Sequence, residues 1–246
     1  MTSRADVNRL SRGTDALVSQ ARADIAAFFY GWDVTDPADM RDALLEIVPS
    51  LVREYGDLAG TAAAEWYEEL RTGAVGGSYN AVLADGASDA AVEGSVRWAA
   101  GELFGDNPSQ VLELLNGAVQ RHIMQVARET VRRNVGQDRS RPRFARVPAL
   151  GEVCPFCDML ASRGFAYSTE QTAGDEDDPY HDNCRCQVVP EWDAESAHIA
   201  GYDPDAMYDR YQEARAVWDA KNSRAPQAND LVPILRELYP ELYPVT

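Results

Sequence analysis

The sequence predicts an α+β fold in which a mainly helical N-terminal region is followed by a small α+β module with a Cys/His knuckle. Apolar residues recur at intervals of three, four or seven through most of the first 135 residues, which is helical periodicity. The pattern changes to alternation of polar and apolar residues after residue 140, and all four cysteines fall in the segment after that change. We therefore expect a helical region at 1–139, the Cys/His module at 140–195 and a helical C-terminal tail at 196–246.

The first helices can be placed from periodicity and from start signals. Residues 4–30 carry one apolar stripe, so the first helix is amphipathic. Asp36 as N-cap and Pro37 at the first helical position open a second segment, which Pro49 should break or kink before the helix resumes. A glycine-rich link follows, and a further helix is expected from Asp89 to Leu103.

The longest helix and the elements after it follow from similar signals. Asn107-Pro108 repeats the start signal, and one apolar stripe continues to Gly136, a plausible residue just past a helix end. Two or three short strands, including Arg143–Val147 and Cys186–Pro190, should frame the cysteine motif, and the acidic run 174–179 should be a loop. In the tail we expect helices at 204–220 and after Asn229-Asp230, packed on the body or on a partner.

Composition excludes some classes of protein. The chain has 246 residues and a formal net charge of −17, which argues against a protein that coats nucleic acid or an anionic membrane. No stretch reaches the roughly 18 apolar residues that a membrane span needs, and the N-terminus lacks the apolar core of a signal peptide. We expect a protein without membrane contact that is soluble and intracellular when made.

The cysteine motif predicts a structural zinc site. Thiolates and a neutral imidazole are the ligands that Zn²⁺ prefers, and C-x₂-C lets two sulfurs meet one tetrahedral ion. Five candidates compete for four positions, and we expect one of Cys184 and Cys186, which are only two residues apart, to be left out. Two disulfides, or buried thiols without metal, remain the alternatives. The candidate ligands are Cys154, Cys157, His181, Cys184 and Cys186.

A second candidate site is a run of arginines. Eight arginines lie at 121–146 with only Glu129 and Asp138 among them, in a chain that is otherwise acidic. Such a run could contact nucleic acid weakly or an acidic protein surface, although charge runs are most often a solvated face. The arginines chosen as contacts are Arg132, Arg133, Arg141 and Arg143.

A family resemblance appears at the same residues. The segment Arg143-Phe-Ala-Arg-Val-Pro148, then CPFCDMLASRG at 154–164 and YHDNCRCQVVP at 180–190, resembles the signature of the phage Mu F-like minor head proteins, closest to versions from tailed phages of actinobacteria. The resemblance covers about residues 140–192. It implies a minor capsid protein of head morphogenesis that meets the portal protein, the major capsid protein or the scaffold. Such a protein would be found in the phage head, and in the host cytoplasm during assembly.

The resemblance also raises an enzymatic alternative, because members of that family are often labelled capsid maturation proteases. A serine protease needs a base beside its nucleophile, commonly a histidine. His181 belongs to the cysteine motif and His122 lies on the apolar stripe of a long helix, which leaves His198. Neither a G-x-S-x-G elbow nor an H-E-x-x-H helix is present. We therefore assign no catalytic residue and favour a non-enzymatic protein, with a protease that cleaves scaffold or major capsid protein as the alternative.

Overall fold

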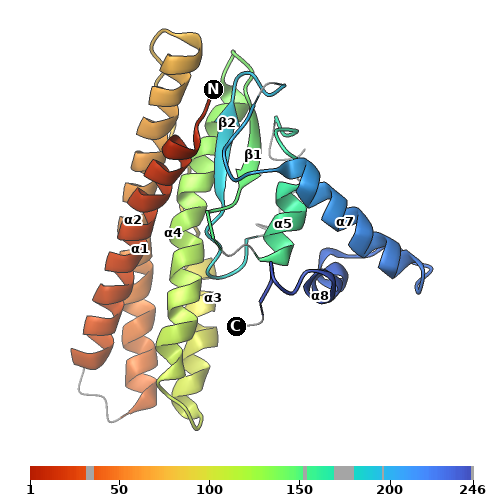
Figure 1. The fold of residues 1–246 in the computed structure, drawn as a ribbon. Coiled ribbons are helices and arrows are strands. Elements are labelled where there is room, and N and C mark those ends of the chain that lie inside the picture. The colour runs from red at the N-terminus through yellow and green to blue at the C-terminus, as the bar shows by residue number, and fades with distance from the viewer. Residues whose placement is uncertain (32–35, 152–153, 169–179, 196, 245–246) are drawn as a thin grey trace. The chain divides into compact units, whose positions relative to one another are not determined.

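The computed structural model describes residues 1–31, 36–151, 154–168, 180–195 and 197–244 (Figure 1). The chain divides into two compact units that we describe separately. The helical unit comprises Arg9–Asn134 and Asp175–Cys184. The α+β unit comprises Met1–Asn8, Val135–Gly174 and Arg185–Thr246. The division into three parts at 1–139, 140–195 and 196–246 that the sequence predicts stays a prediction.

The mainly helical N-terminal region is confirmed. Its elements are α1 (Arg4–Gly31), α2 (Pro37–Val75), α3 (Asp89–Ala100), the 3-10 helix η1 (Gly101–Phe104) and α4 (Gln110–Gln137). Asp36 caps α2 as predicted, since its side chain accepts a hydrogen bond from the Ala38 amide at 2.8 Å. Helix α4 begins at Gln110, two residues after the proline that was expected to open it.

Pro49 does not break α2, although a break was one of the two outcomes, a break or a kink, that the sequence predicted. The helix runs through the proline for 39 residues, and Pro49 itself is buried. A proline inside a helix removes one backbone hydrogen bond. Here the apolar face on both sides of the proline is buried, including Leu44, Val48 and Val52. Burial of that face offsets the missing bond, because tertiary packing supplies most of the stability of a helix in a folded protein.

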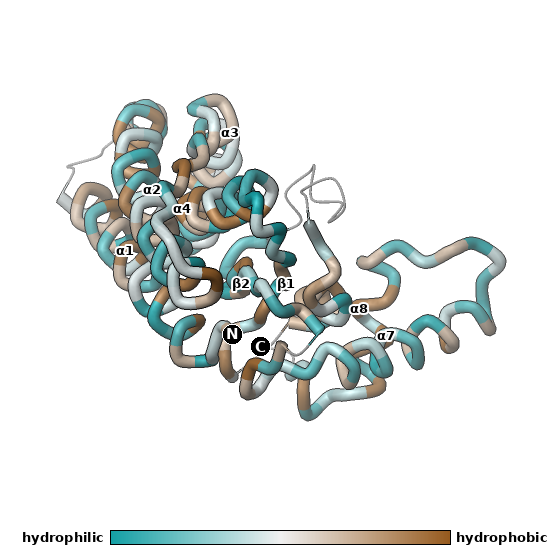
Figure 2. The backbone as a smooth tube through the Cα atoms, turned by 90° about the horizontal axis from the view of Figure 1, so that it is seen from above, coloured by the Kyte–Doolittle hydropathy of each residue, from teal (hydrophilic) through white to brown (hydrophobic). Residues whose placement is uncertain are grey.

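The long helices of the helical unit pack closely through small residues. A Cβ atom added to Gly56 or to Gly60 on α2 would lie 3.0 Å from a methyl group of Val126 on α4. Tyr55 of α2 donates a hydrogen bond to Asp24 of α1 at 2.5 Å, and α1, α2 and α4 lie side by side in Figure 1. Hydrophilic and hydrophobic residues alternate around these helices (Figure 2), which is the amphipathic pattern that the sequence predicted.

The α+β unit contains a two-stranded antiparallel sheet. Strand β1 (Arg143–Val147) pairs with β2 (Gln187–Glu191), with Ala145 opposite Val189. Both strands were predicted to within one residue, and an isolated bridge joins Phe144 to Tyr167. A short helix, α5 (Pro155–Ala161), lies between the strands in sequence and was not predicted. The acidic run 174–179 lies outside the described residues.

The C-terminal helices α7 (Pro204–Asp219) and α8 (Ala228–Leu238) pack against α5, so the expectation that the tail folds back on the body is confirmed. Their shared core consists of Met159, Ala214, Leu231, Leu235 and Tyr243. Helix α8 starts at Ala228, earlier than predicted, because Gln227 is the N-cap and its amide donates to the Asp230 carboxylate at 2.8 Å. Among the described residues, no helix combines the length and the apolar character that crossing a bilayer requires.

Candidate metal centre

The C-P-F-C half of the motif belongs to the α+β unit and is shaped by the start of α5. Cys154 is the N-cap, and its sulfur accepts a hydrogen bond from the Cys157 amide at 3.3 Å. Pro155 occupies the first helical position, where its missing N–H costs no hydrogen bond. This start of a helix turns the two cysteine side chains toward each other, which is what a metal bound by C-x₂-C requires.

Three sulfur atoms gather in the α+β unit. The Cys157 sulfur lies within 4.8 Å of the Cys154 sulfur and within 4.8 Å of the Cys186 sulfur. Two Zn–S bonds of about 2.3 Å at the tetrahedral angle place sulfurs roughly 3.8 Å apart, and the limit of 4.8 Å on these two sulfur pairs is compatible with that spacing. No disulfide joins any two of the four cysteines, all of which lie in the described part of the chain. The cluster could hold a metal ion.

A largely buried ion pair fixes helix α5 in place. Its carboxylate belongs to Asp158, the residue that follows Cys157. Asp158, which is 3% exposed, accepts two hydrogen bonds from the Arg210 guanidinium at 2.9 and 3.0 Å and one from the Tyr243 hydroxyl at 2.7 Å. The bond from Arg210 to Asp158 raises the pKa of Arg210, and burial, followed by the bond to Asp158, raises the pKa of Tyr243. Asp158 therefore connects α5 to Arg210 of α7 and to Tyr243.

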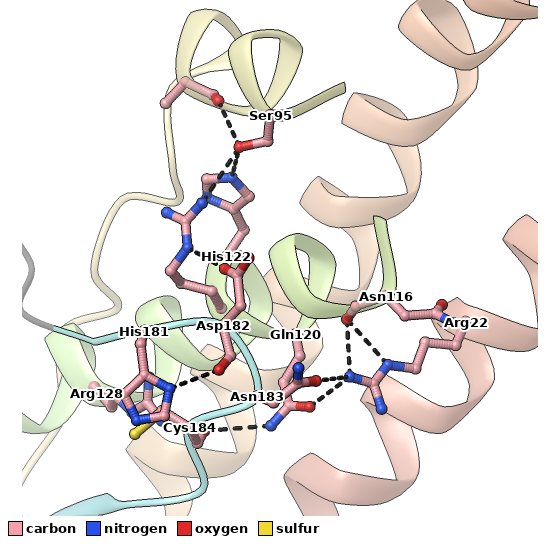
Figure 3. Close-up of polar contacts among 12 residues, drawn as sticks. Arg22, Ser95, Asn116, Gln120, His122, Arg128, His181, Asp182, Asn183 and Cys184 are labelled. Atoms are coloured by element: carbon pink, nitrogen blue, oxygen red, sulfur yellow. Dashed lines mark hydrogen bonds and ion pairs between the residues drawn. The ribbon is translucent and has the colours of Figure 1, made fainter. Parts of the chain in front are cut away.

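The H-D-N-C half of the motif belongs to the helical unit. His181 is exposed and Cys184 is buried, and the Cys184 amide donates to the His181 carbonyl oxygen at 3.2 Å (Figure 3). Strand β2 begins only at Gln187, so neither Cys184 nor Cys186 lies in a strand. Both are buried. The choice between these two thiols as the fourth ligand stays a prediction.

The helical unit contains a second cluster of polar side chains that the sequence analysis missed. The Ser95 hydroxyl on α3 lies 3.0 Å from Nε2 of His122 on α4, and Arg121 donates to the same hydroxyl at 3.3 Å (Figure 3). Burial, then the neighbouring charge of Arg121, lowers the pKa of His122 to about 4, so the ring is neutral at pH 7. His122 is a core histidine as expected, but its partner could not be found because Ser95 is 27 residues away and in another helix.

His198, the base that the sequence analysis left for a protease, lies in the α+β unit. It lines a pocket of about 690 Å³ together with Phe165, Tyr202, Asp205 and Arg210, among other residues. The Tyr202 hydroxyl donates to the Ala161 carbonyl oxygen at 2.7 Å. Among the described residues, the lining of this pocket contains neither a serine nor a cysteine that could act as the nucleophile of a protease beside His198.

The four chosen arginines differ in exposure. Arg132 is 3% exposed and forms an ion pair with Glu129, so its guanidinium offers no surface to a phosphate in this structure. Arg133 donates to the Leu83 carbonyl oxygen and to Asp85, whose pKa this contact lowers. Arg141 and Arg143 are exposed. A contact with DNA or with an acidic partner therefore stays a prediction. Of the four arginines, Arg141 and Arg143 remain the candidates for that contact.

Comparison with known proteins adds one finding. A family model described as VG15 protein matches residues 1–214. The chain belongs to the VG15 family. The family's name indicates a viral, phage gene product, and the match includes all five residues of the Cys/His motif. No curated protein and no solved structure matches the chain.

Proposed function

We propose that this VG15 protein is a minor capsid protein that takes part in head morphogenesis of a tailed phage and associates with the portal or the inner capsid during assembly. The observation that carries the proposal is the VG15 match over residues 1–214, together with the Mu F-like pattern from Arg143 to Pro190. The expected partners are the portal protein, the major capsid protein or the scaffold. The expected location is the virion.

An exposed aromatic pair on the helical unit supports association with a protein. Trp98 near the end of α3 is 60% exposed, and Phe104 at the end of η1 is 59% exposed. Aromatic residues are enriched where protein surfaces meet and often carry much of the binding energy. These two side chains are the first place to test for a docking contact.

Phage lacking the gene, complemented with variants, would test the proposal. Loss of the gene should leave few or no filled heads, and mass spectrometry of heads from the complemented phage should find the protein in them. Trp98→Ala with Phe104→Ala should reduce incorporation, whereas Tyr30→Ala, which removes another exposed aromatic ring of the helical unit, should not. Normal heads that form without the protein would contradict the proposal.

We also infer a structural zinc ion for the cysteine motif, bound by Cys154, Cys157, His181 and one of Cys184 and Cys186. The thiol grouping of the α+β unit supports this inference, as does the preference of zinc for sulfur and imidazole ligands. Four protein ligands close such a site, so its role is to stabilise the fold rather than to catalyse. Elemental analysis of reduced protein purified without chelator should find about one zinc per chain. If protein purified in this way contains no metal, the zinc site is wrong. The proposed role in head morphogenesis does not depend on this result.

A capsid maturation protease remains the second candidate, and one observation favours it. Ser95 and His122 form a hydrogen-bonded serine and histidine pair, the arrangement in which a base can activate a serine nucleophile. If this pair cleaves the scaffold or the capsid subunit, Ser95→Ala should abolish processing in assembled heads while His198→Ala leaves it intact. Mass spectrometry of the capsid subunit's N-terminus would show equal processing in all heads if the pair is only structural.

A further inference from the structure

Residues 181–184 form a tight turn on the surface of α4. The Cys184 amide donates to the His181 carbonyl oxygen across the turn at 3.2 Å. Asn183 has a φ of +63°, a conformation that asparagine and glycine adopt most readily, and the third position of a type II turn requires a positive φ. The turn fixes the spacing between the histidine and the cysteine at its two ends.

Side chains of the helical bundle hold the last three residues of this turn (Figure 3). The Cys184 carbonyl oxygen accepts hydrogen bonds from Arg128 at 2.8 Å and from Gln120 at 3.2 Å, both on α4. Arg121 donates to the Asp182 carboxylate at 2.7 Å, and Arg22 of α1 donates to the Asn183 side-chain oxygen at 3.0 Å. The turn is therefore anchored by charged donors at three consecutive residues.

The guanidinium of Arg128 has a second contact at the start of the same segment. Its central carbon lies 3.8 Å from the centre of the Tyr180 ring, and both residues are buried. A guanidinium stacked on an aromatic face is attracted by the ring's negative π surface. Arg128 thus fixes the residue before the turn and the last residue of the turn at once.

Gly117 lets the turn lie against α4. A Cβ atom added at this position would be 2.9 Å from the Asp182 Cβ atom and 3.3 Å from its carboxyl carbon. Cβ atoms essentially never approach so closely, so any larger residue would push the turn away from the helix. Glycine weakens a helix interior relative to alanine, and its presence in the middle of α4 is explained by this contact.

The turn also fixes which nitrogen of His181 is available. His181 Nδ1 lies 2.6 Å from the Asp182 carbonyl oxygen. A carbonyl oxygen can only accept, so Nδ1 carries the proton and Nε2 presents its lone pair. Histidines that bind metals almost always donate their other ring N–H to a carbonyl or a carboxylate in this way.

We propose that the helical unit holds the turn that carries His181 in a metal-binding orientation before any metal arrives, with Gly117, Arg121 and Arg128 as positioning residues. The proposal rests on the zinc site inferred above and adds the reason for its affinity. Groups that orient metal ligands typically change affinity by 10- to 100-fold when they are removed. A turn that is already formed spares the ion the cost of ordering it.

The test is a comparison of metal affinity in the full chain. Gly117→Ala should weaken Zn²⁺ or Co²⁺ binding about 10- to 100-fold in competition with a chromogenic chelator. Gly94→Ala is the matched control, because Gly94 lies inside α3 with no atom within 4 Å of an added Cβ, and it should leave the affinity unchanged. Circular dichroism in excess chelator would confirm that both metal-free variants are folded.

A double variant separates displacement of the turn from general damage. Asp182→Gly removes the Cβ atom that an alanine at 117 would strike. Gly117→Ala should therefore cost much less affinity in the Asp182→Gly background than in the native one. Equal losses in both backgrounds would contradict the proposed contact.

The Co²⁺ absorption spectrum gives a readout that a merely structural role would not change. Arg128→Met should alter the bands that report the cobalt ligands, because the Cys184 end of the turn is released. A native protein that binds neither metal would refute the zinc site and this proposal together. A native protein that binds metal with an affinity unaffected by Gly117→Ala and Arg128→Met would refute the positioning role alone.

Discussion

The two halves of the Cys/His motif are held in different ways. The C-P-F-C half takes its shape from residues next to it in sequence, since Cys154 caps the helix that Pro155 begins. The H-D-N-C half takes its shape from residues about 60 positions away, because Gln120, Arg121 and Arg128 anchor it on α4. The first half would form in a short peptide more readily than the second, which needs the folded helical unit.

The comparison shows that only the C-P-F-C half carries the signals for its shape in its own sequence. A cap and a proline are local signals, and they act wherever the segment is placed. Contacts over a long sequence separation depend on which faces of the helices meet, and no spacing in the sequence reports this. Even the local half depends on distant partners, since Asp158 is held by Arg210 and Tyr243.

The largest expected effect comes from removing the local half. Replacing Cys154 and Cys157 together with serine should abolish zinc binding and lower the free energy of unfolding by several kcal/mol, on the order of what loss of a structural metal costs. Urea denaturation with elemental analysis measures both. Native and variant proteins should be equally stable in excess chelator, and a variant with unchanged stability in the presence of zinc would show that the cysteines are merely packed.

Asp158→Ala tests how far the local half depends on its distant anchor. Leaving the Arg210 guanidinium without its carboxylate should cost roughly 3 kcal/mol of stability, because the pair is largely buried. The side chain of Asp158 is 4% exposed and that of Arg210 is 19% exposed. Asp219→Ala breaks the exposed pair with Arg215 on the same helix and should cost under about 0.5 kcal/mol. Similar small losses from both changes in urea denaturation would show that Asp158 is not an anchor.

The pH dependence of stability that arises from His122 tests the part of α4 that anchors the H-D-N-C half. Its folded-state pKa of about 4 lies below the ordinary value of 6.5, so the unfolded chain binds the proton more readily. Stability should be unaffected by this group above pH 6.5 and should fall by roughly 2–3 kcal/mol as the pH drops toward 4. Comparing native protein with His122→Asn at pH 7 and pH 4.5 isolates the effect from carboxylate titration. Parallel pH profiles would contradict it.

The smallest effect concerns the exposed arginines that precede and begin β1. Arg141→Gln with Arg143→Gln should weaken any DNA binding at low salt and reduce its salt dependence by about one unit of slope for each phosphate that is no longer neutralised. Arg133→Gln is the matched control, because Arg133 already donates to Asp85 and Leu83. A filter-binding titration that finds no DNA binding by the native protein would remove the nucleic-acid contact from the arginine prediction.

Sequence by itself determined the elements and the identity of the candidate ligands. The helices that begin at Arg4, Pro37 and Asp89 and the strands at Arg143 and Gln187 were found to within a few residues, because periodicity and caps are local. Of the break or kink expected at Pro49, the break does not occur, since burial on both sides of the proline outweighs one missing hydrogen bond. Helix α5 escaped notice because seven residues are too few to show a period.

Tertiary structure alone decided which side chains meet. It buried Arg132 while leaving Arg141 and Arg143 exposed, placed Ser95 beside His122, and brought Asp158 to Arg210. The tertiary structure also explains the glycine at position 117, because the Asp182 Cβ atom occupies the space that any side chain there would need. The contacts of Ser95 with His122, of Asp158 with Arg210 and of Gly117 with Asp182 each join residues at least 27 positions apart. Pairings of that kind arise from the packing of whole helices, which the order of the residues does not reveal.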